Sequence, residues 1–333
     1  MKAKLSLIFF LMLCLFATGV QADKTDRLIR KANRYFAPLP QIMPGSENDT
    51  PERIELGREL YFDPRLSIND SQSCASCHPL GNGRGGMDNR PTSPGARGEF
   101  GDRNTPTVLN AGWQSSQFWD GRAKDLADQA RQPILNPIEM GMPDEASVVN
   151  KLSAIPDYVD AFEKAFPEDA SPLSYGNLAE AIAAFERTLR SESRFDDFMR
   201  GDKTALNAQE QSGLTLFIRH NCVRCHDGPL IGGTLLEKLG VSAEFHNTED
   251  PGRFRVTGEE ADRMVFKVAS LRNVAITGPW FHDGSGKELS EVVKIMARIQ
   301  LDTELKAQDA DAITAFLHAL TGKEFETAAA VSQ

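Results

Sequence analysis

Two short motifs of identical pattern constrain this chain more than any other feature of its sequence. Each reads Cys-x-x-Cys-His; the first runs from Cys74 to His78 and the second from Cys222 to His226. This is the attachment signature of haem c, because two thiols can add to the two vinyl groups of one porphyrin while the adjacent imidazole binds its iron. A redox dithiol does not need the histidine, and a zinc site gathers its cysteine pairs close together in sequence. The sequence therefore predicts two covalent haems, held by Cys74 with Cys77 and by Cys222 with Cys225.

The N-terminus has the pattern of an export signal. Two lysines precede an apolar run from Leu5 to Phe16, and small residues around Ala22 precede a cut at Asp23. Residues 1–22 are therefore predicted to be a secretory signal peptide, with a retained N-terminal anchor as the alternative. No later stretch is long and apolar enough to span a bilayer. An even number of cysteines in an exported chain suggests disulfides, but the histidine after each pair favours haem.

The charge of the chain limits its partners. The formal net charge is −10, and we expect no basic stripe on the surface. This balance argues against binding to nucleic acid. It favours a basic or dipolar protein partner that long-range attraction steers to the surface, although plain solubility explains it equally well.

The stretches before the two motifs are similar, which suggests an internal duplication. The first has a helix start at Thr50 and Pro51, and the second has a capping box from Asn207 to Glu210. Apolar residues at helical spacing predict a long amphipathic helix and a last helix closed by Gly322; they are Leu178, Ile182, Phe185 and Leu189, then Ile313, Phe316, Leu317 and Leu320. We therefore predict a mostly α-helical chain with two cytochrome c-like haem domains, residues 23–188 and 189–333.

Residues 54–325 resemble the bacterial dihaem cytochrome c peroxidases. The resemblance rests on the two haem motifs and on four further blocks, Asp88–Ser93, Arg103–Asn110, Phe118–Arg122 and Leu271–Val274. It implies that a low-potential haem in the N-terminal half reduces hydrogen peroxide, and that a high-potential haem in the C-terminal half accepts electrons. The electrons would come from a small cytochrome c or a cupredoxin in the periplasm. Family members are commonly homodimers, so we expect a homodimer.

The resemblance also assigns ligands to both irons. His78 is expected to be the proximal ligand of the peroxide-reducing haem, and His226 that of the other haem. Met296 stands where the family places the sixth ligand of the high-potential haem, and a thioether raises the potential of haem iron. Taken alone, a methionine on a helix is more often part of a core.

Peroxide cleavage needs a group that takes a proton from one oxygen and returns it to the other. Glu139 and Gln129 match the family's distal acid and amide, and a carboxyl group in a closed pocket has the raised pKa that suits this role. Without the resemblance, Glu139 reads as a surface acid. Trp119 matches the aromatic residue between the two haems, where it would conduct electrons, and it is equally suited to a core.

The family's interdomain calcium site has counterparts in this chain. The Asn104 side chain and the backbone carbonyl groups of Thr277 and Pro279 match its protein ligands, and oxygen ligands suit calcium. Waters would complete the coordination shell. We therefore expect one calcium ion besides the two haems c.

One position departs from the pattern of many family members. In those proteins a distal histidine binds the peroxide-reducing iron in the oxidised resting state and leaves only after the other haem is reduced. Counting between the fixed blocks puts Ala96 at this position, and no histidine lies between His78 and His220. Alanine cannot bind iron, so we expect an open iron site that needs no reductive activation. Met87 is a weaker substitute, because the family has no ligand there.

Two other functions compete with peroxide reduction. Related dihaem oxidases modify a tryptophan or tyrosine of a partner protein through high-valent iron, and they also have an open haem, so Ala96 favours them. They usually lack the methionine ligand, so Met296 favours the peroxidase. An electron carrier would need a second ligand for each iron, and the missing partner of His78 speaks against it.

Overall fold

The computed structural model describes residues 24–81 and 83–325, and the predicted signal peptide lies outside these residues. A helical segment occupies residues 24–32. The further α-helices are α2 Pro51–Phe62, α3 Cys74–Cys77, α4 Leu126–Leu135, α5 Glu145–Ser153, α6 Pro156–Ala165, α7 Tyr175–Glu186, α8 Arg194–Met199, α9 Ala208–Arg219, α10 Phe254–Thr257, α11 Leu289–Leu301 and α12 Ala307–His318. Two short antiparallel pairs complete the fold, β1 Leu80–Gly81 with β2 Arg84–Gly85 and β3 Leu236–Lys238 with β4 Val265–Lys267. The chain is therefore mostly helical, as predicted, and no helix among the described residues has the length and apolar character needed to cross a membrane.

The sequence located two helix starts well and two helix ends poorly. Leu189, predicted for the long amphipathic helix, lies beyond α7, which ends at Glu186. The Thr50 hydroxyl accepts the backbone N–H of Arg53 at 3.2 Å and begins α2, and Asn207 with Glu210 forms the predicted capping box of α9. The predicted last helix ends at His318, so Leu320 and Gly322 lie beyond α12. Leu320 is nevertheless buried, because the turn after the helix folds back onto the same core. Apolar spacing alone cannot separate a last helical turn from a packed loop.

The two halves of the chain are built on equivalent helix pairs. Gly57 lets α2 approach α7 so closely that an ideal Cβ atom would lie 1.8 Å from the carbonyl oxygen of Ala181. Gly213 does the same for α9 and α12, with 1.9 Å from its ideal Cβ to the carbonyl oxygen of Ala312. Each of these glycines lies on the helix that precedes a haem motif. The shared contact supports the duplication inferred from the sequence.

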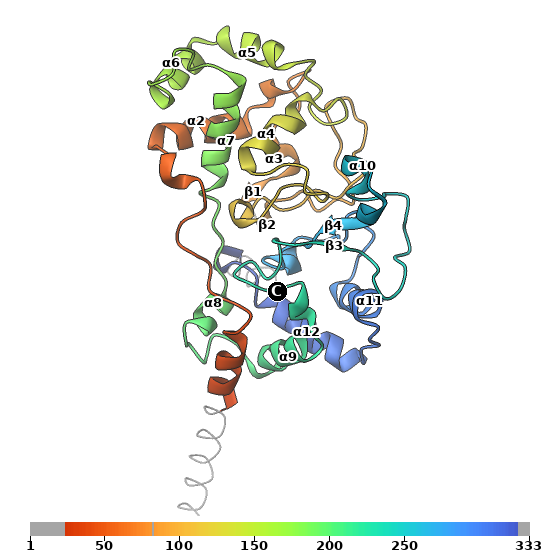
Figure 1. The fold of residues 1–333 in the computed structure, drawn as a ribbon. Coiled ribbons are helices and arrows are strands. Elements are labelled where there is room, and N and C mark those ends of the chain that lie inside the picture. Colours follow the sequence, from red (N-terminus) through yellow and green to blue (C-terminus); the bar gives the residue numbers. More distant parts are fainter. Residues whose placement is uncertain (1–23, 82, 326–333) are drawn as a thin grey trace, which may run out of the picture.

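Each helix pair has its own apolar core. Leu56, Leu60 and Ile182 belong to the core formed by α2, α4, α5, α6 and α7, in the upper part of Figure 1. A second core, with Leu214 and Phe316, joins α8, α9 and α12 in the lower part. These two cores position the two cysteine motifs, since α3 follows α2 and the second motif follows α9.

The N-terminal segment does not follow the predicted division at residue 188. Ile29, Ala32 and Phe36 belong to the core of the second half. Residues 23–188 are therefore not one spatial unit, because their first part is covered by α8 and α9; the boundary itself stays a prediction. The spacing of apolar residues in a sequence shows that a helix has an apolar face, but it does not show which core that face joins.

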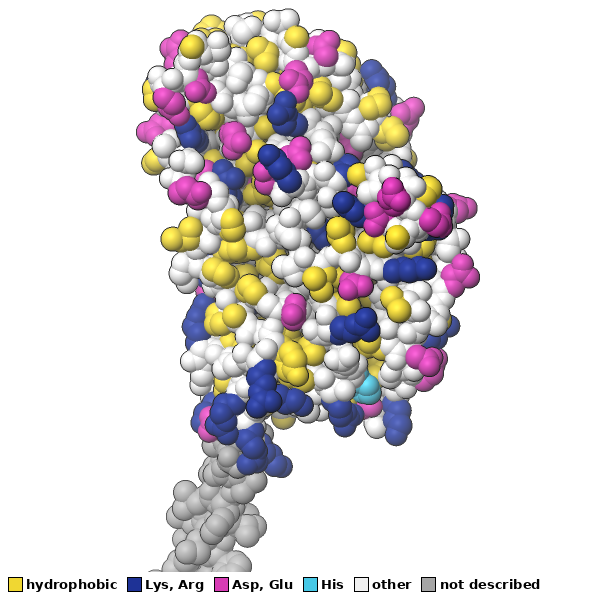
Figure 2. Space-filling model, in the orientation of Figure 1, with side chains coloured by type: hydrophobic (Ala, Val, Ile, Leu, Met, Phe, Trp, Pro, Cys, Tyr) yellow, Lys and Arg dark blue, Asp and Glu magenta, His cyan; other side chains and the backbone are white. Residues whose placement is uncertain are grey.

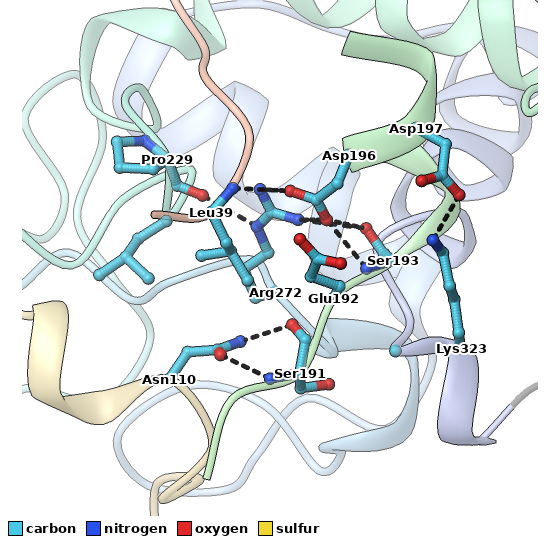
Figure 3. A network of polar contacts seen from close by, with 12 residues as sticks. Leu39, Asn110, Ser191, Glu192, Ser193, Asp196, Asp197, Pro229, Arg272 and Lys323 are labelled. Atoms are coloured by element: carbon cyan, nitrogen blue, oxygen red, sulfur yellow. Dashed lines mark hydrogen bonds and ion pairs between the residues drawn. The ribbon is translucent and has the colours of Figure 1, made fainter. Parts of the chain in front are cut away.

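A buried ion pair fixes this segment to the second half. Arg272 and Asp196 form two hydrogen bonds, of 2.5 and 3.0 Å, with side chains that are 1% and 0% exposed. Asp196 also accepts the backbone N–H of Leu39 at 2.8 Å, and Arg272 donates to the carbonyl of Pro229 at 2.9 Å. Figure 3 shows how the guanidinium group lies between these partners. Four segments that are distant in sequence thus meet at one charge pair.

Candidate functional site

The first motif lines a cavity of about 420 Å³. Cys74, Cys77 and His78 lie on its wall, and α3 presents the two thiols from a single helical turn. The His78 Nδ1 atom lies 3.3 Å from the carbonyl oxygen of Gly86, which can only accept, so Nδ1 carries the proton and Nε2 is left with a lone pair. The Tyr61 hydroxyl donates to the His78 carbonyl at 2.6 Å and holds the motif against α2.

The thiols of this motif are unpaired and its imidazole is neutral, as a covalent haem requires. Both cysteines are free, and burial raises the pKa of Cys77 to about 11 and that of Cys74 further. Burial lowers the pKa of His78, so the imidazole stays neutral, which is the form that binds iron. The walls of the cavity therefore fit a haem c.

The second motif repeats this arrangement. It forms a 3₁₀ turn, Cys222–Arg224, and the His226 Nδ1 atom lies 3.3 Å from the carbonyl oxygen of Ile231. Burial lowers the pKa of His226 to about 4. As in the first motif, the Nε2 atom of a neutral imidazole is left for iron. The two motifs therefore orient their histidines in the same way, although the first forms an α-helical turn and the second a 3₁₀ turn.

The acid and the amide proposed for peroxide cleavage lie on the same cavity as the first motif. Glu139 and Gln129 both line it. The side chain of Asn136 donates to Glu139 Oε1 at 2.6 Å, so Oε2 is the oxygen free to exchange a proton. Burial raises the pKa of Glu139, although the hydrogen bond from Asn136 opposes this effect. Glu139 is therefore not the ordinary surface acid that the sequence alone suggested.

The loop that carries Ala96 closes on the segment that carries Glu139. The backbone N–H of Ala96 donates to the carbonyl of Glu139 at 2.7 Å, and that of Gly95 donates to the carbonyl of Glu99 at 2.8 Å. Of the residues that line the cavity, His78 is the only histidine. No second imidazole therefore faces the space above His78 within the described residues.

Trp119 lies between the cavity and the second half. It lines the cavity and packs on a cluster that includes Phe266 and Phe281, against which Met296 also packs. Its indole N–H donates to the carbonyl of Asn104 at 2.8 Å, and its own carbonyl accepts the backbone N–H of Lys267 at 2.6 Å. The structure thus places Trp119 and Met296 against the same apolar cluster, while the assignment of Met296 as an iron ligand stays a prediction.

The residues expected to bind calcium lie in segments that contact the other half of the chain. Asn104 is buried, and its backbone N–H donates to the carbonyl of His282 at 2.7 Å. Near Thr277 and Pro279, the side chain of Asn89 donates to the carbonyls of Ile276 and Gly278, at 2.9 and 2.8 Å. No group of three or more acidic, histidine or cysteine side chains suited to a metal gathers among the described residues. A calcium ion here would depend on amide and carbonyl oxygens.

Sequence reasoning missed two buried ionisable groups at the site. Glu186 lines the cavity beside Cys74, its Oε2 atom has no hydrogen-bond partner, and burial raises its pKa to about 8. The sequence does contain a sign of its burial, because Glu186 lies one turn after Ile182 on the apolar face of α7. Lys267 is buried next to Trp119 with Gln114 as its partner, and burial lowers its pKa to about 8.

An ion-pair network joins the halves beside Trp119. Arg103 binds Asp120 at 2.6 Å and Asp250 at 2.6 Å, so one guanidinium group connects the two halves of the chain. Arg122 also binds Asp120, at 3.0 Å. Three of these residues lie in the sequence blocks that carried the family resemblance, and their role is to hold the junction.

Comparison with known proteins agrees with the geometry of the site. The family model described as "Di-haem cytochrome c peroxidase" matches residues 51–204. The cytochrome c551 peroxidase of Pseudomonas aeruginosa is 43% identical over 316 residues, which cover 93% of this chain and 90% of that protein. This chain belongs to the dihaem cytochrome c peroxidase family.

The same family includes proteins with other names. The methylamine utilization protein MauG of Methylorubrum extorquens is 36% identical to this family member over 278 residues, which cover 82% of this chain and 76% of that protein. The crystal structure of a MauG-like protein associated with microbial copper homeostasis matches with a TM-score of 0.75 and 30% identity, over 86% of this chain and 94% of the other. Membership alone therefore does not separate a peroxidase from a MauG-like protein.

Proposed function

We propose that this chain is a periplasmic dihaem cytochrome c peroxidase that reduces hydrogen peroxide to two waters. The observation that carries the proposal is the composition of one cavity. Cys74, Cys77 and His78 line it together with the half-buried residues Glu139 and Gln129. A haem attachment site and a proton-exchanging acid thus share one cavity.

The two motifs would hold one haem c each, through Cys74, Cys77 and His78 and through Cys222, Cys225 and His226. The free thiols, the neutral imidazoles and the carbonyl groups that orient them support this assignment. When bound, the haem of the first motif supplies the iron at which peroxide takes up two electrons.

Glu139 would perform the proton transfer. Its Oε2 atom accepts a proton from the peroxide oxygen nearer the iron and delivers it to the oxygen that leaves as water. Asn136 holds the other carboxylate oxygen in place. The side-chain amide of Gln129, on the same wall, would orient the peroxide by hydrogen bonding. Two further protons and two electrons complete the reduction to two waters.

With alanine at position 96, this residue would supply no ligand to the iron, so the enzyme would react with peroxide without prior reduction. The hydrogen bond from Ala96 to Glu139 supports this proposal, since it keeps the loop in place beside the acid. Stopped-flow mixing of the fully oxidised protein with peroxide tests it. A spectral change within the mixing experiment is expected, and no change before reduction would overturn the open site.

Electrons would arrive from a small cytochrome c or a cupredoxin at the haem of His226 and Met296, and pass Trp119 on the way to the first haem. The shared packing of Trp119 and Met296 supports this route. A calcium ion at Asn104, Thr277 and Pro279 would hold the junction that the route crosses. The protein would be a homodimer, exported by its signal peptide.

A partner-modifying oxidase is the second candidate, and Ala96 is the observation that favours it. Steady-state peroxide consumption by the as-isolated oxidised protein, with reduced cytochrome c as donor, separates the two. Immediate turnover without a lag supports the peroxidase. Bleaching by peroxide with little oxidation of cytochrome c would instead assign the chain to the oxidases.

A further inference from the structure

The helical segment at the start of the described chain has one strongly basic side, so the expectation of a surface without a basic stripe is wrong for this segment. Its exposed residues, with those of the turn that follows it, include five that carry positive charge, which we call the basic face: Lys24, Arg27, Arg30, Lys31 and Arg34. Residues on the opposite side, Ile29, Ala32 and Phe36, are buried in the second core. The only acid between residues 24 and 36 is Asp26, and it pairs with Lys203 at 2.6 Å. In Figure 2, Lys and Arg side chains gather above the grey N-terminal trace.

The basic face lies next to the second haem motif. The backbone N–H of Gly228, two residues after His226, donates to the carbonyl of Tyr35 at 2.7 Å. The ring of Phe36 lies 6.3 Å from that of Phe217, which lies 6.4 Å from the imidazole of His226. A single phenylalanine therefore separates the basic segment from the expected iron ligand.

Two further bases extend this surface to the motif itself. Arg219 ends α9, and Arg224 stands between the two cysteines of the second motif; both are exposed. The acids in the neighbourhood, Asp227 and Glu237, are half-buried. The fully exposed charged side chains of the second motif and of the end of α9 are therefore basic, in a chain whose formal net charge is −10.

We propose that the basic face, with Arg219 and Arg224, is the docking surface for an electron-donor protein whose own docking face is acidic. The inference rests on the proposed function, in which electrons arrive at the His226 haem. The net charge of the chain favoured a basic partner, but association rates depend on the charge at the contact, and complementary patches raise them by about 10–10³-fold at low salt. Like charges gathered on one side of a helix repel each other, and an acidic partner would relieve that repulsion.

Stopped-flow reduction of the His226 haem in the mature holoprotein, without peroxide, tests the proposal. The probes are two reduced small c-type cytochromes, one with an acidic and one with a basic haem-edge surface. We expect the acidic cytochrome to react faster, with a rate that falls as salt rises from about 20 to 300 mM. Arg30→Glu with Arg34→Glu should lower that rate about ten-fold at low salt. Lys124→Glu with Lys164→Glu, an equal charge change on the first half, should leave it unchanged.

Several outcomes would overturn the proposal. One is a faster reaction with the basic cytochrome, and another is a rate that both double variants lower equally. A third is loss of binding to phosphatidylglycerol vesicles in Arg30→Glu with Arg34→Glu while the cytochrome rate is unchanged, which would assign the surface to anionic lipid. Peroxide turnover driven by ascorbate and a small redox mediator reports on the proposed function separately. If that turnover fails while the salt-dependent reduction by the acidic cytochrome is observed, the proposed function is wrong and the docking surface is supported.

Discussion

Breaking the buried ion pair between Arg272 and Asp196 should destabilise the second half more than any surface change. The substitution Asp196→Asn keeps the size of the side chain and leaves a guanidinium group that is 1% exposed without a counter-charge. Removing one partner of such a pair costs about 3–5 kcal/mol. The amide of the variant has one acceptor oxygen in place of two, so it cannot accept all the N–H groups that Asp196 accepts from Arg272, Ser193 and Leu39. The expected loss of unfolding free energy therefore lies in the upper part of the range of about 3–5 kcal/mol.

Thermal and urea unfolding of the holoprotein, followed by circular dichroism, measure this loss. For a chain of this size, about 2 °C of melting temperature corresponds to 1 kcal/mol, so a decrease of about 6–10 °C is expected. Asp197→Asn is the matched control, because the adjacent Asp197 forms pairs with Lys323 and Arg200 near the surface, at 2.5 and 3.3 Å. Such pairs contribute about 0–1 kcal/mol. Equal losses in the two variants would refute the reasoning.

The pH dependence of this effect has a definite sign. Burial alone would raise the pKa of Asp196, but the ion pair with Arg272 and the N–H groups of Ser193 and Leu39 outweigh it and lower the pKa below its usual value. The pair therefore contributes fully above the unfolded pKa of about 4, and its contribution is lost as pH falls through the folded pKa. The stability difference between the wild type and Asp196→Asn should shrink below about pH 4, and a constant difference would contradict this assignment.

Four further predictions concern the site and the helix pairs. Glu139→Gln should lower the turnover number for peroxide about 10²–10⁴-fold while leaving the visible spectrum intact; near-normal turnover would exclude Glu139 as the proton carrier. Ala96→His should convert the oxidised spectrum to a low-spin form and introduce a lag in peroxide turnover; an unchanged spectrum would mean that position 96 cannot reach the iron. Burial raises the pKa of Glu186 to about 8, so the free energy of unfolding should fall by about 1.4 kcal/mol per pH unit between about pH 4.5 and 8. In Glu186→Gln, the free energy of unfolding measured in urea should change less with pH in that window. An equal slope in both proteins would contradict the raised pKa. Gly213→Ala should cost about 1–3 kcal/mol in urea unfolding, because α9 and α12 must separate, whereas Gly176→Ala, whose nearest heavy atom would lie 3.9 Å away, should cost nothing; equal effects would refute the close-contact argument.

Local chemistry explains why part of this protein could be predicted. The Cys-x-x-Cys-His spacing defines a haem c site within five residues, and the caps at Thr50 and Asn207 define helix starts within four. Glu139 and Gln129 were found only through resemblance to a family, because nothing in their local sequence marks them as pocket residues. The structure adds the reason for their chemistry, since burial and Asn136 set the pKa of Glu139 and leave one oxygen for the proton.

Long-range contacts explain the rest. The sequence by itself determined the two haem attachment sites, the helical class, the duplication and the family, because each depends on residues that are neighbours in the chain. Only the tertiary structure decided that the segment around Phe36 joins the second core, that Glu186 is enclosed beside Cys74, and that Arg272 holds four segments together. Burial and pairing are properties of the whole packed chain, because a side chain loses its water only when distant residues cover it.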